Sequence, residues 1–355
     1  MGSRVVIMAG GTGGHVYPAL AVAEELRARD CAVTWMGTER GLESRVVPAA
    51  GFPLDTLTVA GLRGKGWRDR LTGPFLLIGA CLQAIRILRR RRPDVVLGLG
   101  GFVAGPGGLM CRVLGIPLVI HEQNCVPGTT NRWLARIARR VLEAFPGSFP
   151  VAVQAECTGN PVRRALLEQS VRAPASRDRP LRILVFGGSL GAQVLNETVP
   201  EALALLDEPC EIRHQTGSAL REQTAALYRR LGIEAEVVAF IEDMAAAYRW
   251  ADLAVCRAGA MTVSELAVMG LPAILVPYPY AIDDHQTANA RFFEEGGAGL
   301  CVPQTQLTKA CLASQLCALS ADREQIAAMG RQARTLARPD AAQRVAAICL
   351  AETQS

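Results

Sequence analysis

Residues 4–15 read RVVIMAGGTGGH, a short run rich in β-branched side chains that ends in a turn of glycines. Residues 16–30 follow with the apolar spacing of a helix, and residues 32–37, AVTWMG, form a second strand-like run. A strand, a glycine turn and a helix in alternation are typical of a parallel sheet with helices on both faces. The opening of the chain therefore predicts a doubly wound α/β domain.

The same pattern returns in the second half of the chain. Residues 181–192, LRILVFGGSLGA, again place a glycine turn between a strand and a helical pattern. Segments 93–120 and 251–276 also echo one another, since each passes from a strand through a helix to Gly-x-Pro and a second strand. This internal similarity indicates two domains of the same type.

The length of 355 residues is long for one hydrophobic core and sufficient for two. We therefore predict two doubly wound domains, residues 1–160 and 161–337, which face each other across a cleft and bind ligands at the carboxyl ends of their strands. A last helix within residues 338–355 is expected to pack back on the first domain.

Composition and charge narrow the class of protein. Half of the residues are hydrophobic and 20% are charged, which is typical of a packed globular chain and excludes a disordered one. The 11 cysteines include no C-x-x-C pair, so they fit neither a disulfide framework nor a zinc site and predict thiols in a reducing, cytoplasmic compartment. The first 160 residues hold 19 Arg and Lys against 11 Asp and Glu, whereas the remainder holds 19 against 22. This asymmetry predicts that the first domain faces something anionic.

A basic and apolar segment in the first domain is the candidate for that contact. Residues 61–68 form a glycine-rich basic loop, and the helix expected from residue 74 ends in four consecutive arginines. No stretch reaches the roughly 20 apolar residues that span a bilayer, so the segment predicts peripheral attachment to the cytoplasmic face of the membrane. The alternative is an ordinary buried helix with a solvated basic end. The membrane-facing candidates are Trp67, Phe75, Leu76, Arg86, Arg89 and Arg90.

Three glycine turns predict phosphate binding. They are residues 10–15, 100–108 and 187–192, and each follows a strand. Glycine lets the backbone approach a phosphate closely, and the N–H groups of a helix start favour an anion. Neither a dinucleotide fingerprint nor a P-loop is present, and a plain tight turn is the alternative. Turns in both halves predict that both reactants carry phosphates.

Two polar groups in the first domain are candidates for catalysis. His15 lies at a helix start, where the helix dipole disfavours the imidazolium form and keeps the ring available as a base; a structural cap is the alternative. Residues 121–124, HEQN, end an apolar strand and are expected to face the cleft. Leaving such groups buried and unpaired costs about 1–3 kcal/mol each, so a polar ligand or network is expected there.

Further polar groups lie near and beyond the domain boundary. Arg163 has the forked donor geometry that suits a diphosphate, although a surface arginine is the simpler explanation. In residues 256–265, CRAGAMTVSE, a Thr or Ser is expected to cap a helix whose N–H groups bind a diphosphate, while Glu265 can accept both ribose hydroxyls. A capping box is the alternative. Gln286 and Asn289 are expected to reach sugar hydroxyls. No D-x-D motif is present, and we expect no metal or other cofactor.

Eight motifs in order resemble the MurG family, the N-acetylglucosaminyltransferases of peptidoglycan synthesis. They are GGTGGH, GLRGKG, GGFVAGPGG, HEQN, GNPVR, GGSLGA, CRAGAMTVSE and DDHQTANA, and they cover nearly the whole chain. The resemblance implies the GT-B fold of two Rossmann-like domains. It also implies UDP-N-acetylglucosamine as donor and undecaprenyl-diphospho-N-acetylmuramoyl-pentapeptide as acceptor, with attack of the acceptor's 4-hydroxyl on the anomeric carbon and inversion.

The resemblance also assigns roles to residues. His15 is the expected base, with Glu122 as the second candidate, and Phe102 stands where tyrosine is also common. The residues expected to bind the donor are Thr12, Gly13, Gly14, Asn124, Arg163, Ser189, Ile241, Ala260, Met261, Thr262, Val263, Ser264, Glu265 and Gln286. Those expected to bind the acceptor are Gly100, Gly101, Phe102 and Gly105. Two other functions stay open: a diacylglycerol glycosyltransferase of the same fold, and a UDP-sugar 2-epimerase.

Overall fold

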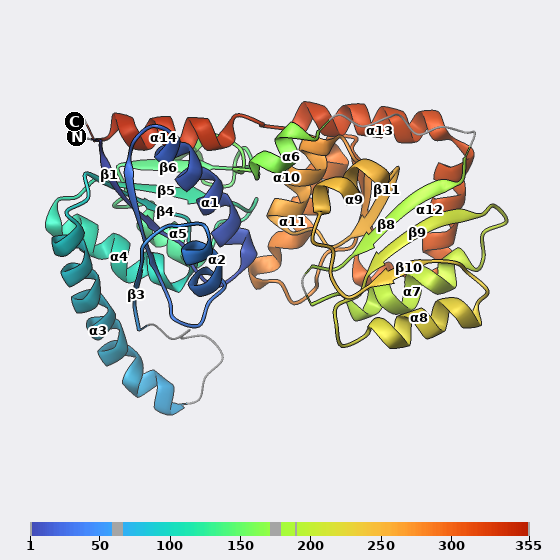
Figure 1. The fold of residues 1–355 in the computed structure, drawn as a ribbon, viewed down its shortest axis with the longest axis horizontal. Helices are drawn as coiled ribbons and strands as arrows, with labels where there is room; N and C mark the ends of the chain where they lie inside the picture. Colours follow the sequence, from blue (N-terminus) through green and yellow to red (C-terminus); the bar gives the residue numbers. More distant parts are fainter. Residues whose placement is uncertain (1, 59–66, 171–178, 189, 354–355) are drawn as a thin grey trace. The chain divides into compact units, whose positions relative to one another are not determined.

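The computed structural model describes residues 2–58, 67–170, 179–188 and 190–353, except for the side chains of residues 67–75 and 282. The chain forms two compact units (Figure 1). The first comprises Met1–Arg163 together with Arg338–Ser355, and the second comprises Arg164–Ala337. The α/β class predicted from the strand and glycine-turn pattern is confirmed in both units.

The first unit is a parallel seven-stranded sheet in the order β3-β2-β1-β4-β5-β6-β7. The order reverses between β1 and β4, which is where open α/β sheets bind ligands. Its strands are β1 (Arg4–Met8), β2 (Ala32–Gly37), β3 (Leu54–Thr56), β4 (Val95–Gly98), β5 (Leu118–Glu122), β6 (Arg140–Glu143) and β7 (Glu156–Cys157). Its helices are α1 (Gly13–Ala28), α2 (Glu43–Ala49), α3 (Trp67–Arg91), α4 (Gly101–Leu114), α5 (Thr129–Leu134), the 3₁₀ turn η1 (Val151–Val153) and α14 (Ala341–Ala351).

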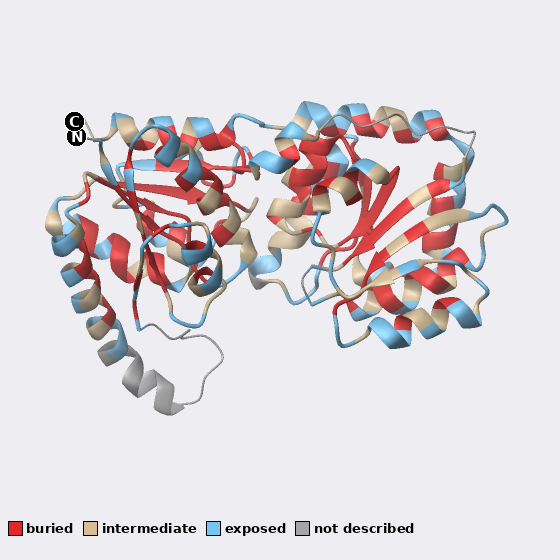
Figure 2. Cartoon of the chain, viewed as in Figure 1, coloured by how far each residue is buried: buried red, intermediate tan, exposed pale blue. Residues whose placement is uncertain are grey.

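Both faces of this sheet are covered, so β1, β4 and β5 are almost entirely buried (Figure 2). Residues of α1 and α14 close one core, and residues of α3 and α4 close the other. Helix α14 packs against α1, and Glu352 pairs with Arg139 at 2.7 Å. The last helix of the chain therefore belongs to the first unit.

The second unit is a parallel six-stranded sheet in the order β10-β9-β8-β11-β12-β13, with its reversal between β8 and β11. Its strands are β8 (Leu181–Phe186), β9 (Cys210–Gln215), β10 (Glu236–Val238), β11 (Leu253–Cys256), β12 (Ala273–Leu275) and β13 (Gly299–Cys301). Its helices are α6 (Arg164–Glu168), α7 (Gln193–Leu203), α8 (Arg221–Arg230), α9 (Met244–Trp250), α10 (Ala260–Met269), α11 (His285–Glu295), α12 (Lys309–Ala321) and α13 (Arg323–Leu336), with 3₁₀ turns η2 (Ile282–Asp284) and η3 (Gln304–Gln306).

A buried histidine joins three elements of the second unit. His214 of β9 is 0% exposed; its Nε2–H donates to Asn196 Oδ1 and its Nδ1 accepts from the Tyr228 hydroxyl, both at 3.0 Å. Asn196 in turn donates to Thr216 O at 3.0 Å. Burial lowers the pKa of His214 from 6.5 to about 3, so the ring stays neutral.

This histidine predicts a loss of stability in acid. Below pH 6.5 the unfolded chain binds a proton that folded His214 does not, so the free energy of unfolding falls by about 1.4 kcal/mol per pH unit until about pH 3. We expect urea denaturation at pH 8 and pH 5 to reveal a drop of about 2 kcal/mol from this group. His214→Gln, which can keep both hydrogen bonds, should shrink the difference by that amount. An unchanged difference would contradict the assignment.

Candidate active site

The two glycine turns of the first unit touch each other at the point where the strand order reverses. Gly101 begins α4 with a φ of +77°, and a Cβ there would lie 2.7 Å from Gly10 O. At Gly100, whose φ is +99°, a Cβ would lie 3.1 Å from the His15 ring. A side chain at either position would be strained by the positive φ, and at Gly101 it would also clash with the backbone of Gly10. Glycine therefore lets the two turns meet. The structure thus brings the predicted residues of both turns together.

His15 and the start of α1 form one side of this site. Thr12 is the N-cap residue of α1, and Gly13 and Gly14 supply its first N–H groups. The half-buried His15 ring places Nδ1 3.4 Å from Thr12 Oγ1. This arrangement offers an anion the helix-start N–H groups with an imidazole beside them.

A buried carboxylate that the sequence analysis missed supports the first glycine turn. Glu43, 0% exposed, accepts hydrogen bonds from Gly11 N and Thr38 N at 2.9 Å and from Thr38 Oγ1 at 2.7 Å. A Cβ at Gly10, Gly37 or Gly41 would lie within 2.7 Å of this side chain. Burial alone would raise the pKa of Glu43, but the hydrogen bonds together lower it, so the carboxyl stays ionised. In the sequence, the only indication of this buried carboxylate is the glycine at positions 10, 37 and 41, where the absence of a Cβ leaves room for it.

The prediction that the HEQN side chains face a cleft is wrong for three of the four. His121, Glu122 and Gln123 are at most 2% exposed. His121 Nε2–H donates to Gly159 O at 2.9 Å, and its Nδ1 accepts from Gln123 Nε2 at 3.0 Å. Burial lowers the pKa of His121, which keeps the ring neutral. These polar groups bond to one another and to backbone groups, so the expected network is found inside the protein.

Glu122, the second candidate base, anchors the loop that follows β5. Its carboxylate accepts from the backbone N–H groups of Gln123, Asn124 and Gly128 at 3.0 Å, and from Asn131 Nδ2 at 2.9 Å. The acceptor sites of this buried carboxylate are thus occupied by donors from its own loop and from α5. The geometry therefore favours a structural role for Glu122 over a catalytic one.

Four other predicted residues lie near this loop or at the edges of the two turns. Asn124 is half-buried and its Nδ2 lies 3.3 Å from Glu122 Oε1. Phe102 is 57% exposed, and a Cβ at Gly105 would contact Thr130. The Arg163 guanidinium lies 5.3 Å from the centre of the Tyr17 ring in α1. Arg163 is thus held against the helix whose first turn carries His15.

In the second unit the glycine turn after β8 is pressed against the end of β9. Gly191 has a φ of +76°, and a Cβ there would lie 1.8 Å from Thr216 O. Gly191 N donates to Gly188 O at 2.9 Å, which closes the turn. Ser189, predicted to bind the donor, lies outside the described residues. The turn precedes α7, as expected for a phosphate-binding turn.

The start of α10 lies beside this turn in the sheet order, after β11. Gly259 is the N-cap residue, and Val263 N makes the first backbone bond back to it. The predicted capping by Thr262 or Ser264 is wrong, because no side chain caps the helix and the Ser264 hydroxyl donates to Ala260 O at 2.9 Å. The N–H groups of Ala260, Met261 and Thr262 lie ahead of the first helical bond and are oriented to bind an anion.

Glu265 lies one turn further along α10 and is 8% exposed. Its Oε2 accepts from the Tyr248 hydroxyl of α9 at 3.0 Å. Helix α9 begins three residues after Ile241, the residue expected to contact the base. The carboxylate and the loop expected to bind the base are therefore joined through one short helix.

The sugar-binding prediction divides between two residues of α11. Gln286 is half-buried, and its Oε1 accepts from Tyr278 N at 3.0 Å. Asn289 is 0% exposed and donates to Ala258 O at 3.1 Å, so the prediction that it reaches a sugar is wrong. It instead ties α11 to the loop before α10.

The fold and the site define a nucleotide-dependent glycosyltransferase of the GT-B type, with two Rossmann-like units that each carry glycine turns at the reversal of strand order. Residues 5–143 match the N-terminal domain of glycosyltransferase family 28, and residues 182–345 match its C-terminal domain. The chain belongs to glycosyltransferase family 28.

Three relatives illustrate the similarity. The chain is 61% identical over 353 residues, 99% of both chains, to the UDP-N-acetylglucosamine–N-acetylmuramyl-(pentapeptide) pyrophosphoryl-undecaprenol N-acetylglucosamine transferase of Methylococcus capsulatus. It is 55% identical, with the same coverage, to the protein of that name from Azotobacter vinelandii. The crystal structure of MurG from Acinetobacter baumannii superposes with a TM-score of 0.85 at 42% identity, covering 98% of this chain and 99% of that one. The resemblance inferred from the eight motifs is confirmed.

Proposed function

We propose that this protein transfers N-acetylglucosamine from UDP-N-acetylglucosamine to the 4-hydroxyl of undecaprenyl-diphospho-N-acetylmuramoyl-pentapeptide, and releases UDP. The observation that carries the proposal is the 61% identity, over 99% of both chains, to a transferase named for this reaction. The glycine turns and helix starts described above are suited to two substrates that each carry a diphosphate.

The donor binds to the second unit in this proposal. The start of α10 and the turn that includes Gly191 hold the diphosphate, Glu265 accepts the ribose hydroxyls, and the backbone at Ile241 reads the uracil. Gln286 and Asn124 contact the sugar, while Arg163 and the Thr12–Gly14 turn complete the diphosphate site. The acceptor diphosphate binds to the turn at Gly100, Gly101, Phe102 and Gly105 of the first unit.

The reaction is a single displacement. The acceptor oxygen attacks the anomeric carbon as the bond to the UDP oxygen breaks, which inverts the configuration. His15 Nε2 takes the proton from the 4-hydroxyl, and the N–H groups at the start of α10 stabilise the charge that develops on the leaving diphosphate.

An assay of UDP release tests the proposal. We expect release from UDP-N-acetylglucosamine with a short-chain analogue of the muramoyl lipid and little release without it. Turnover with diacylglycerol in place of the muramoyl lipid would support the other lipid glycosyltransferase. Conversion of the donor alone to a 2-epimer would support the epimerase.

Attachment to the anionic inner leaflet of the cytoplasmic membrane is part of the proposal. Among the described helices, none is long and apolar enough to cross a bilayer. Ile78, Leu82, Arg86 and Arg89 of α3 are all exposed and recur at helical spacing, so one face is apolar and then basic. Leu76 is also exposed, whereas the side chains of Trp67 and Phe75 lie outside the described part of the chain, as do residues 59–66. Trp67 is the first residue of α3, which begins seven residues earlier than expected.

Helix α4 packs against both α3 and α5, and both α4 and α5 carry exposed apolar side chains. Val113 of α4 and Trp133 of α5 are each 63% exposed. An apolar surface flanked by arginines suits an anionic interface.

Vesicle binding checks this surface. Arg90 and Arg91 pair with Asp55, so the informative change is Arg86→Gln with Arg89→Gln. At about 1 kcal/mol for each arginine, binding to anionic vesicles at low salt should weaken roughly 20- to 30-fold. The matched control is Arg229→Gln with Arg230→Gln, two exposed arginines that end α8 in the second unit. Equal losses in the two double variants would argue against a membrane role for α3.

A further inference from the structure

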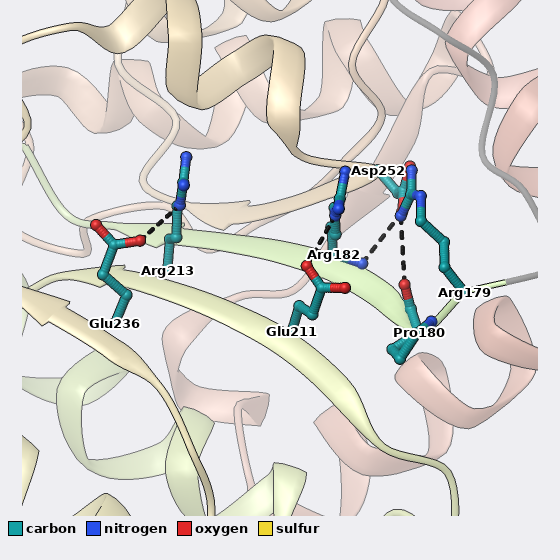
Figure 3. Close-up of polar contacts among 7 residues, drawn as sticks. All are labelled: Arg179, Pro180, Arg182, Glu211, Arg213, Glu236 and Asp252. Carbon is teal, nitrogen blue, oxygen red and sulfur yellow. Dashed lines mark hydrogen bonds and ion pairs between the residues drawn. The ribbon is translucent and has the colours of Figure 1, made fainter.

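Gln215 is the last residue of β9 (Cys210–Gln215). Side chains alternate along a strand, so Glu211, Arg213 and Gln215 share one face of the sheet. Glu211 and Arg213 make ion pairs with neighbouring strands at 2.8 and 2.7 Å (Figure 3). Gln215 is only 4% exposed and directs its amide group at backbone carbonyls instead. It is therefore the one member of this row that contacts the loops at the carboxyl end of the sheet.

The Gln215 amide links two loops that come from different crossovers. Nε2 donates to Gly188 O at 3.0 Å and to Ala239 O at 3.2 Å. Gly188 belongs to the glycine turn after β8, and Ala239 precedes Ile241 by two residues. The same carbonyls also accept backbone hydrogen bonds, from Gly191 N at 2.9 Å and Gly217 N at 3.1 Å. One NH₂ group thus connects the turn expected to hold phosphates to the loop expected to hold the base.

The strand beneath these loops is held by close contacts and hydrogen bonds to its neighbours. Gly191 is in direct contact with Thr216 O, which leaves the turn no room to move toward β9. His214 and Thr216, the two neighbours of Gln215, are both bonded to Asn196 of α7. The end of β9 is thus held in place by its neighbours, and the amide of Gln215 fixes the distance between the two loops above it.

We infer that Gln215 is a positioning residue of the donor site, which sets the distance between the base-binding loop and the phosphate-binding turn. The inference rests on the proposed function, because it takes a nucleoside diphosphate as the ligand. A ligand that reaches both loops gains affinity only when their separation matches its length, whereas a ligand that reaches one loop is indifferent to it. Gln215 needs no contact with the nucleotide for this role.

Gln215→Met tests the inference, because methionine keeps the volume and removes both donors. Calorimetry measures the affinity for uridine, which reaches only the base-binding loop, and separately the affinity for UDP, which reaches both loops. We expect UDP affinity to fall at least about tenfold, since the two hydrogen bonds that join the loops are lost and the loops separate, while uridine affinity changes less than about twofold. Gln215→Glu, which points a carboxylate at both carbonyls, should lower UDP affinity further.

Arg213→Met is the matched control, two residues earlier on the same face of the same strand. It breaks the ion pair to Glu236 and should leave the ratio of UDP to uridine affinity unchanged. A Gln215→Met protein with the wild-type ratio would overturn the inference, whatever its thermal stability. Failure of the wild-type protein to bind UDP would instead overturn the proposed function, so the two failures are distinguishable.

Discussion

Glu265→Ala is expected to weaken UDP binding by about 10²- to 10⁴-fold. The carboxylate is 8% exposed and held by the Tyr248 hydroxyl at 3.0 Å, so its direction is set before the ligand arrives. A carboxylate has about four acceptor sites and can accept from Tyr248 and from both ribose hydroxyls together. Each charge-assisted hydrogen bond contributes about 1.5–3 kcal/mol, which gives the expected range for two. Isothermal calorimetry with UDP measures the change.

A comparison of UDP with 2′-deoxy-UDP makes this test specific. The wild-type protein should prefer UDP, and Glu265→Ala should lose most of that preference because the partner of the 2′-hydroxyl is gone. Glu197→Ala on α7 is a suitable control, since Glu197 is exposed and contacts Gln193 on its own helix. If Glu265→Ala still discriminated between the two nucleotides, another residue would have to bind the ribose.

Most of the fold could be predicted because local pattern and tertiary structure agree. Residues 4–8 and 181–186 are apolar runs followed by glycines, and each becomes the strand beside the point where its sheet reverses order. A parallel strand is buried on both faces, so its sequence is apolar throughout and easily recognised. The short edge strands β3 and β10 carry no such signal, because they are half-exposed and three residues long.

The candidate site was predicted less completely, because a polar residue at the end of a strand can bind either a ligand or other groups of the protein. The spacing of HEQN is the same whether the side chains bind a ligand or groups of the protein, and here three of the four are buried and bond to groups of the protein. Glu43 and Gln215 were missed for a related reason. Each acts by accepting from or donating to distant backbone groups, and no sequence spacing identifies which backbone groups will lie nearby.

His15→Ala is expected to lower kcat by about 10²- to 10⁴-fold while the affinity for UDP changes less than about twofold. The ring is half-buried on the first turn of α1, beside Gly100, so its loss removes a proton acceptor and leaves the helix start in place. His15→Gln sharpens the test, because glutamine keeps a polar contact with Thr12 but cannot take a proton. Both variants should therefore be equally impaired, and kcat is measured as UDP release at saturating donor and acceptor.

Glu122→Gln gives the contrasting result that separates a base from a loop anchor. Glutamine would direct an NH₂ group at donors that now bond to a carboxylate, so the variant should lose thermal stability together with activity. His15→Gln should lose activity at an unchanged melting temperature. Should Glu122→Gln instead keep its melting temperature and lose turnover while His15→Gln stays active, the assignment of His15 as the base would be wrong and Glu122 would take its place.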